Sequence, residues 1–164
     1  RLLRTGRALV VGMERGARQR SRRLAERLLA LDDHDSLGLR ELVLDQLLRD
    51  GRDAEALAVS HPPAGEPLGE DALGLLLGRA LALFRLERSE EAAEALAQAR
   101  GYNHHALPLL CAEAPRPGLP AGTGDGVVAP GSRAEAWQYR TLMRDQWRTT
   151  PGALEWLEGW LASL

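Results

Sequence analysis

The sequence has very few of the residues that β-strands favour. Among its 164 residues there is no Ile, one Phe and two Tyr, while Leu and Ala are abundant. β-branched and aromatic side chains stabilise strands, whereas Leu and Ala have high helix propensity. The composition therefore predicts an all-α protein, and the length suits one domain with a substantial hydrophobic core.

Cysteine and long apolar segments are also scarce. Cys111 is the only cysteine, which excludes an intramolecular disulfide and is typical of the reducing cytoplasm. No apolar run approaches the roughly 18–20 residues that a membrane-spanning helix needs. Arg1, Arg4 and Arg7 interrupt the short apolar stretch at the N-terminus, unlike the apolar region of a signal peptide. We therefore expect a cytoplasmic protein that does not enter a membrane.

Lysine is absent, so all 21 basic residues are Arg, and they are unevenly distributed. Residues 1–30 carry nine Arg and two Glu, a net charge of +7, although the whole chain has a net charge of −2. Such a segment either contacts nucleic acid or an acidic protein, or forms a solvated helix face. We favour the solvated face. The alternative function is nucleic-acid binding through Arg15, Arg18, Arg20, Arg22, Arg23 and Arg27, of which Arg15, Arg18 and Arg22 lie near one helix face.

The sequence contains none of the motifs that usually carry catalysis or bind metals. It has no phosphate-binding P-loop, no nucleophile elbow and no paired catalytic carboxylates. His104 and His105 are adjacent, so on a helix their side chains diverge by about 100°. No CxxC or HxxxH pair of zinc ligands occurs. We therefore expect a non-enzymatic protein without catalytic residues, bound metal or cofactor.

The most informative pattern is an internal repeat. Gly16, Gly51 and Glu87 occupy equivalent turns, 35 and 36 residues apart, each of which follows one apolar helix and precedes another. The residue five positions after each turn is small, which allows two helices to approach closely. The period is that of the tetratricopeptide repeat, so we expect antiparallel helix pairs stacked as a short solenoid with a C-terminal helical cap. The small residues are Ser21, Ala56 and Ala92.

The same pattern predicts where the helices lie and how they begin. We expect Gly51 to adopt a positive φ at the end of a helix. Side chains that can accept a backbone hydrogen bond, or a Thr-Pro pair, mark the helix starts. The predicted N-caps are Asp53, Ser89, Ser132 (with Glu135) and Thr150 (with Pro151). The predicted helices span residues 2–14, 17–31, 36–49, 53–60, 70–86, 89–100, 132–147 and 151–163.

A Pro- and Gly-rich segment divides the chain. Residues 115–131 include four Pro and five Gly, which predicts an extended linker. We expect residues 1–114 to form the helical repeats and 132–164 to form a Trp-rich helical cap that packs on them. All four Trp lie in this last part, where Trp156 and Trp160 share one helix face. Structural capping is the favoured interpretation, and a homodimer contact through these two side chains is the functional alternative.

Two segments resemble a known group of proteins. Residues 35–48 and the motif Thr-Pro-Gly-Ala-Leu-Glu-Trp-Leu at 150–157 resemble bacterial tetratricopeptide-like proteins described as similar to the suppressor-of-tumorigenicity-seven proteins. The resemblance covers about residues 15–160. It implies an all-α repeat fold with a C-terminal helical cap, and it implies no catalytic residues. Leu44 and Leu47 depart from the pattern, because the repeat usually has Gly and Tyr there.

An open stack of helix pairs has a concave surface, lined mainly by the first helix of each pair. Mapping the repeat onto this sequence puts apolar and charged side chains together there, which suits an extended peptide or a partner helix. Alternatively, the C-terminal cap covers this surface and its apolar residues are core. The principal functional hypothesis is a scaffold or adaptor that binds a protein or peptide. The predicted groove residues are Glu41, Asp45, Leu48, Arg49, Leu77, Leu81, Phe84 and Arg85.

Overall fold

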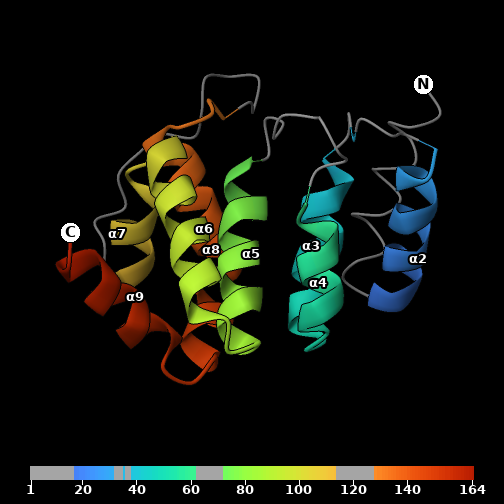
Figure 1. Ribbon diagram of the computed structural model, residues 1–164. Coiled ribbons are helices and arrows are strands. Elements are labelled where there is room, and N and C mark those ends of the chain that lie inside the picture. Colours follow the sequence, from blue (N-terminus) through green and yellow to red (C-terminus); the bar gives the residue numbers. More distant parts are fainter. Residues whose placement is uncertain (1–16, 32–34, 36–37, 62–71, 114–127) are drawn as a thin grey trace.

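The computed structural model describes residues 17–31, 35, 38–61, 72–113 and 128–164 (Figure 1). Within these ranges the chain is all-helical, with eight helices and no strand, which confirms the all-α part of the predicted fold class. The predicted helix at 2–14 and most of the predicted linker lie outside the described residues. None of the eight helices is long and apolar enough to cross a membrane. They are α2 (Arg18–Leu29), α3 (Leu39–Arg49), α4 (Asp53–Val59), α5 (Ala72–Arg85), α6 (Ser89–Tyr102), α7 (Ala106–Cys111), α8 (Arg133–Thr149) and α9 (Ala153–Ala162).

The helices up to α6 pack on one another in chain order. Contacts join α2 to α3, α3 to α4, α4 to α5 and α5 to α6, and α3 also packs directly on α5. The C-terminal helices then turn back, since α8 contacts α7, α5 and α3, and α9 contacts α7 and α8. In Figure 1, α8 lies behind α5 and α6. The central helix α5 is consequently buried on nearly all sides, as its almost continuous apolar sequence predicts.

Two of the three predicted turns have the same geometry, and the third, at Gly16, lies outside the described residues. Gly51 has φ +70° and Glu87 has φ +60°. In both turns this residue donates its N–H to the carbonyl three residues earlier, and the next N–H bonds to the carbonyl five residues before it. This is the Schellman arrangement that ends a helix with a left-handed residue. The equivalence of these two positions is therefore confirmed, and the small side chains of Ser21, Ala56 and Ala92 are fully buried as expected.

The predicted helix caps are only partly correct. Arg52 and Arg88, rather than Asp53 and Ser89, are the N-cap residues of α4 and α6, and neither cap residue makes a side-chain capping bond. The Asp53 carboxylate is instead 3.2 Å from Nη1 of Arg85. In both helices the N-cap Arg forms an ion pair with the Glu three residues later. Both helices therefore begin with the same feature, an N-cap Arg paired with the Glu three residues later, and not with the predicted side-chain caps.

The two C-terminal helices begin differently from each other. Ser132 caps α8 as predicted, because its Oγ accepts a hydrogen bond from the N–H of Glu135 at 3.2 Å. Thr150 does not cap α9, which begins after Gly152 in a left-handed conformation. The Thr150 hydroxyl instead donates to the carbonyl of Gln146 at 2.8 Å and closes the end of α8. The N–H of Ala153, the first residue of α9, instead donates to the backbone carbonyl of Thr150 at 3.2 Å.

Helix α7 was not predicted, because it is short and contains Pro108. Proline is tolerated in the first turn of a helix, where the backbone N–H has no partner within the helix. Two arginines of α8 lie against the C-terminal end of α7. Arg140 Nη1 donates to the carbonyls of Leu109 and Leu110, and Arg144 Nε donates to that of Leu110 at 3.1 Å. Cationic groups at this end of a helix complement its dipole, so α8 stabilises α7.

Gly78 sets the close approach of α3 and α5. A Cβ atom at this position would lie 2.1 Å from Cδ2 of the buried Leu44. We expect Gly78→Ala to lower the free energy of unfolding by about 1–3 kcal/mol, because overpacking outweighs the better helix propensity of Ala. Urea denaturation followed by circular dichroism measures this change. Gly101→Ala in α6 is the control, since nothing lies within 4 Å of a Cβ atom there, and this change should raise the stability. If both variants change the free energy of unfolding equally, α3 and α5 do not pack closely at Gly78.

Candidate functional site

The apolar residues of the predicted groove are buried. Leu48 is 1% exposed, and Leu77 and Leu81 are fully inaccessible. Phe84 is half-buried, and its ring lies 4.8 Å from that of Trp156 on α9, with 31° between the planes. These four residues are therefore core, which is the alternative interpretation of the pattern. They cannot form an open apolar groove in this conformation.

The two arginines of the predicted groove, Arg49 and Arg85, bind α8. Arg49 donates to the carbonyl of Leu142 at 2.6 Å, and its Nη1 is 3.2 Å from the Asp145 carboxylate. Its Nε donates to Asp45 of its own helix at 2.9 Å. Burial alone would lower the pKa of Arg49, but these two carboxylates raise it. The half-buried Glu41 carboxylate faces Gly74 of α5.

Arg85 makes the densest set of polar contacts on this face. Its Nε donates to the Thr150 hydroxyl at 2.8 Å, and its Nη1 donates to the carbonyl of Leu48 at 2.8 Å. Nη1 also lies 3.2 Å from Asp53, and Nη2 is 3.3 Å from the side-chain oxygen of Gln146. One guanidinium group therefore joins α3 and α4 to the C-terminal end of α8.

Helix α8 presents one apolar stripe to the rest of the molecule. Ala136, Tyr139, Met143 and Trp147 are buried, and their spacing of three or four residues puts them on one side of the helix. The indole N–H of Trp147 donates to the Tyr139 hydroxyl at 3.1 Å. At the N-terminal end, Asn103 Nδ2 donates to the Ser132 carbonyl at 2.8 Å. The surface formed by α3 and α5 is thus occupied by a helix of the same chain.

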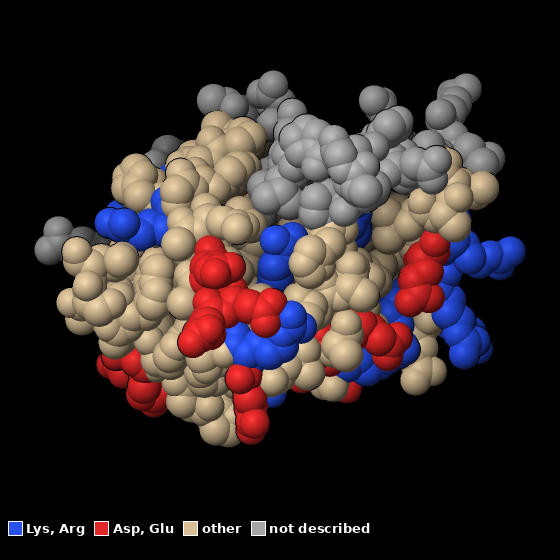
Figure 2. All heavy atoms as spheres, viewed as in Figure 1, with Lys and Arg blue, Asp and Glu red and all other residues tan. Residues whose placement is uncertain are grey.

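The arginines proposed as nucleic-acid contacts differ in their exposure to solvent. Arg15 and the side chain of Arg18 lie outside the described residues. Arg22 is only 8% exposed and pairs with Asp50, so its prediction as a nucleic-acid contact is wrong. Solvent instead surrounds three other arginines of α2, which gather at one end of the molecule (Figure 2). These are Arg20, Arg23 and Arg27, and their spacing places them on one face.

The tryptophans proposed as a dimer contact are both half-buried. Trp156 packs on Phe84, and Trp160 packs at the edge of the core. These contacts account for Trp156 within one chain. The homodimer stays a prediction, which the oligomeric state of Trp160→Ala would test.

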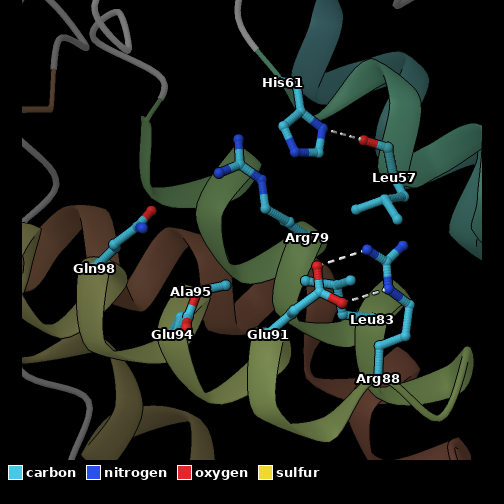
Figure 3. A pocket seen from close by; sticks show the side chains of 9 residues that line it. All are labelled: Leu57, His61, Arg79, Leu83, Arg88, Glu91, Glu94, Ala95 and Gln98. Atoms are coloured by element: carbon cyan, nitrogen blue, oxygen red, sulfur yellow. Dashed lines mark hydrogen bonds and ion pairs between the residues drawn. The ribbon is translucent and has the colours of Figure 1, made fainter.

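Sequence reasoning missed a cleft between α4, α5 and α6. It has a volume of about 200 Å³ and a largely polar lining (Figure 3). Arg79 of α5 projects into it. The sequence did contain a signal, because Arg79 is the only charged residue from Ala72 to Phe84. A lone charge on an apolar helix must find a polar environment, and the cleft provides one.

The polar groups of the cleft are unequally paired. Arg79 donates from Nε to the Ser60 hydroxyl at 3.1 Å and from Nη2 to the Ser60 carbonyl. Burial lowers the pKa of Arg79. Arg88 holds Glu91 through two hydrogen bonds of 2.7 and 2.6 Å, which Figure 3 shows beside Arg79. Among the described residues, Arg79 is therefore hydrogen-bonded only to neutral groups, whereas Arg88 is paired with a carboxylate.

Cys111, on α7, is half-buried and chemically protected. Burial, and to a lesser extent the Glu158 carboxylate, raise the pKa of its thiol from 9.0 to about 11. Because the thiolate is the reactive form, iodoacetamide should label the native protein at pH 8 far more slowly than the urea-unfolded chain. The unfolded thiol loses its proton first, so stability should also fall as pH rises from 9.0 to about 11. Equal labelling rates, measured by mass spectrometry, would contradict this assignment.

Among the residues that the structure describes, no three His, Cys, Asp or Glu side chains are close enough to hold a metal ion. His104 and His105 lie together, with their ring centres 3.8 Å apart. Comparison with protein-family models, curated proteins and solved structures finds no match for this chain. The functional assignment therefore rests on the residues and their geometry.

Proposed function

We propose that the chain is a non-enzymatic scaffold of tetratricopeptide-like helix pairs that binds a protein or peptide partner. The observation that carries the proposal is the repeated turn. Gly51 and Glu87 are 36 residues apart and end their helices with the same hydrogen bonds. Small buried residues follow both turns at the same distance. Units of this kind stack into extended surfaces, and binding partners is what such surfaces commonly do.

We assign the partner to the side of α4 and α6. A partner on α3 and α5 would have to displace α8 and expose Tyr139, Met143 and Trp147, each of which contributes about 1.5–3 kcal/mol through burial. The cleft beside Arg79 is open without such a rearrangement. It combines charged groups with the apolar side chains of Leu57 and Leu83, a mixture suited to a peptide.

Site-specific photo-crosslinking in the source organism tests this proposal. A photoreactive amino acid at Gln98, which lines the cleft, is expected to give a protein adduct. The matched control is Gln138, which is equally exposed but lies on the outer side of α8. Adducts from neither position, or only from Gln138, would contradict the assigned surface.

The arginine face of α2 favours a second candidate, nucleic-acid binding. Arg20, Arg23 and Arg27 are exposed, and no carboxylate of the described chain pairs with them. If they contact phosphates, replacing all three with Gln should reduce the salt dependence of binding by up to about three counterions. Arg148→Gln on α8 is the control. The absence of any gel shift of RNA or DNA at low salt would rule this candidate out.

A further inference from the structure

Arg79 is a half-buried arginine with no carboxylate partner among the described residues. Arg140 and Arg144 have none either, but they bond to the carbonyls at the end of α7. Arg22, Arg49 and Arg85 each lie within 4 Å of a carboxylate, namely that of Asp50, of Asp45 and Asp145, and of Asp53. Within the described ranges Arg79 has no such neighbour, and its hydrogen bonds go only to Ser60. A guanidinium group is always charged, and in a partly desolvated position it gains from an anion. The guanidinium group of Arg79 therefore has no ion-pair partner within the described part of the chain.

One nitrogen of this guanidinium has no hydrogen bond within the described part of the chain. Nε and Nη2 are engaged by Ser60, whereas Nη1 has no bond to a described residue. Figure 3 shows the group projecting between His61 and Gln98. His61 Nδ1 donates to the Leu57 carbonyl at 2.8 Å, so Nε2 of the neutral ring is an acceptor, and the side-chain amide of Gln98 is the neutral donor of the cleft lining. An anion at this point would find one charged donor and one neutral amide donor.

The acidic residues of the cleft limit the charge of that anion. Glu91 is held by Arg88, so it does not neutralise Arg79. Glu94 also lines the cleft. Two nearby carboxylates oppose a doubly charged phosphate more strongly than a singly charged carboxylate. Leu57, Leu83 and Ala95 form an apolar wall, against which the part of the ligand attached to the anionic group can pack.

We propose that this cleft binds a carboxylate of a peptide, with Arg79 as the anchoring residue and an aliphatic side chain beside it. That the ligand is a peptide rests on the proposed scaffold function. The carboxylate is either a C-terminus or a Glu or Asp side chain, since both present the same planar pair of oxygens to a guanidinium.

Nuclear magnetic resonance titration of the full chain tests the proposal. The probes are N-acetyl-leucine for a C-terminus, N-acetylglutamate α-amide for a side chain, and N-acetyl-leucine amide as the neutral control. At constant ionic strength, at least one carboxylate should shift the Arg79 Nε–H and the Gln98 side-chain amide saturably, and the neutral amide should not. The tighter of the two carboxylates identifies the source.

Three variants make the result specific. Arg79→Gln should weaken binding about tenfold or more, since a hydrogen bond to a charged group contributes that much. Arg100→Gln, an exposed change on α6, should have no effect. Glu94→Gln should strengthen binding, because it removes a like charge without touching Arg79; it keeps the test valid if Arg79→Gln does not fold.

Several results would overturn the proposal. They are shifts that do not saturate, equal shifts with the neutral amide, no weakening in a folded Arg79→Gln, or tighter binding of inorganic phosphate. Carboxylate binding without a crosslinked protein at Gln98 would contradict the scaffold function but support the site. A crosslinked protein at Gln98 without carboxylate binding would contradict the carboxylate site but support the scaffold function.

Discussion

Replacing Trp147 with Ala is expected to lower the free energy of unfolding by about 3–5 kcal/mol. The Trp147 side chain is completely inaccessible and forms the end of the apolar stripe of α8. Its removal leaves a cavity and takes the indole N–H from the Tyr139 hydroxyl. Burial raises the pKa of Tyr139 well above its usual range, so that hydroxyl stays protonated and needs a partner. Urea denaturation measures the loss.

Trp160→Ala is the matched control for this experiment. Trp160 is half-buried on α9 and packs only at the edge of the core, so its truncation should destabilise the protein clearly less. If both variants lose the same stability, α8 is not docked as described. Light scattering on the same samples determines the oligomeric state, and a monomer for wild type and Trp160→Ala would eliminate the homodimer hypothesis.

The local pattern of the sequence predicted the helix pairs well. Glu87 was aligned with Gly51 from spacing alone, and both adopt positive φ, although Glu is an uncommon residue there. Such turns are specified by residues within one helix pair, through apolar periodicity and a small side chain at Ala56 or Ala92. Patterns that involve only residues close to one another in the chain can be recognised in a single sequence.

Longer-range features could not be read in the same way. Arg49 bonds to the Leu142 carbonyl across 93 positions of the chain, and no local pattern distinguishes this Arg from a solvent-exposed one. The sequence therefore allows two interpretations of the predicted groove, an open binding surface or a core covered by the C-terminal cap. The exposure of each arginine of α2 could not be predicted for a related reason. Which face carries Arg22 and which carries Arg20 depends on where α3 packs, and Arg22 turns inward to Asp50.

The cleft at Arg79 is the clearest case of missing information. The sequence shows one charge on an apolar helix, and its position between α4 and α6 follows only from the packing of both helices on α5. Nη1 of Arg79 has no hydrogen bond to a described residue, and the nearby Glu91 of the cleft is paired with Arg88. Because the cleft is formed by three helices and one ion pair, its position depends on the tertiary structure and cannot be predicted from the spacing of residues in the sequence.

Arg85→Ala is expected to lower the free energy of unfolding by about 3 kcal/mol. Arg85 is largely sheltered from solvent, and its removal leaves Asp53 without its ion-pair partner and Thr150 without a donor. Because these contacts hold the C-terminal end of α8, backbone amides there should also exchange with deuterium faster than those of α6. Urea denaturation and hydrogen exchange measure the two effects.

Arg88→Ala provides the comparison, since Arg88 pairs with Glu91 in full contact with solvent and its loss should leave the melting temperature unchanged within error. A double-mutant cycle with Asp53→Ala then separates the ion pair from the bonds to α8. If Asp53→Ala removes the whole effect of Arg85→Ala, Arg85 acts only between α4 and α5. If most of the effect remains, as we expect from the bonds to Thr150 and Gln146, Arg85 is the residue that keeps α8 on the surface where the repeat pattern predicted a partner.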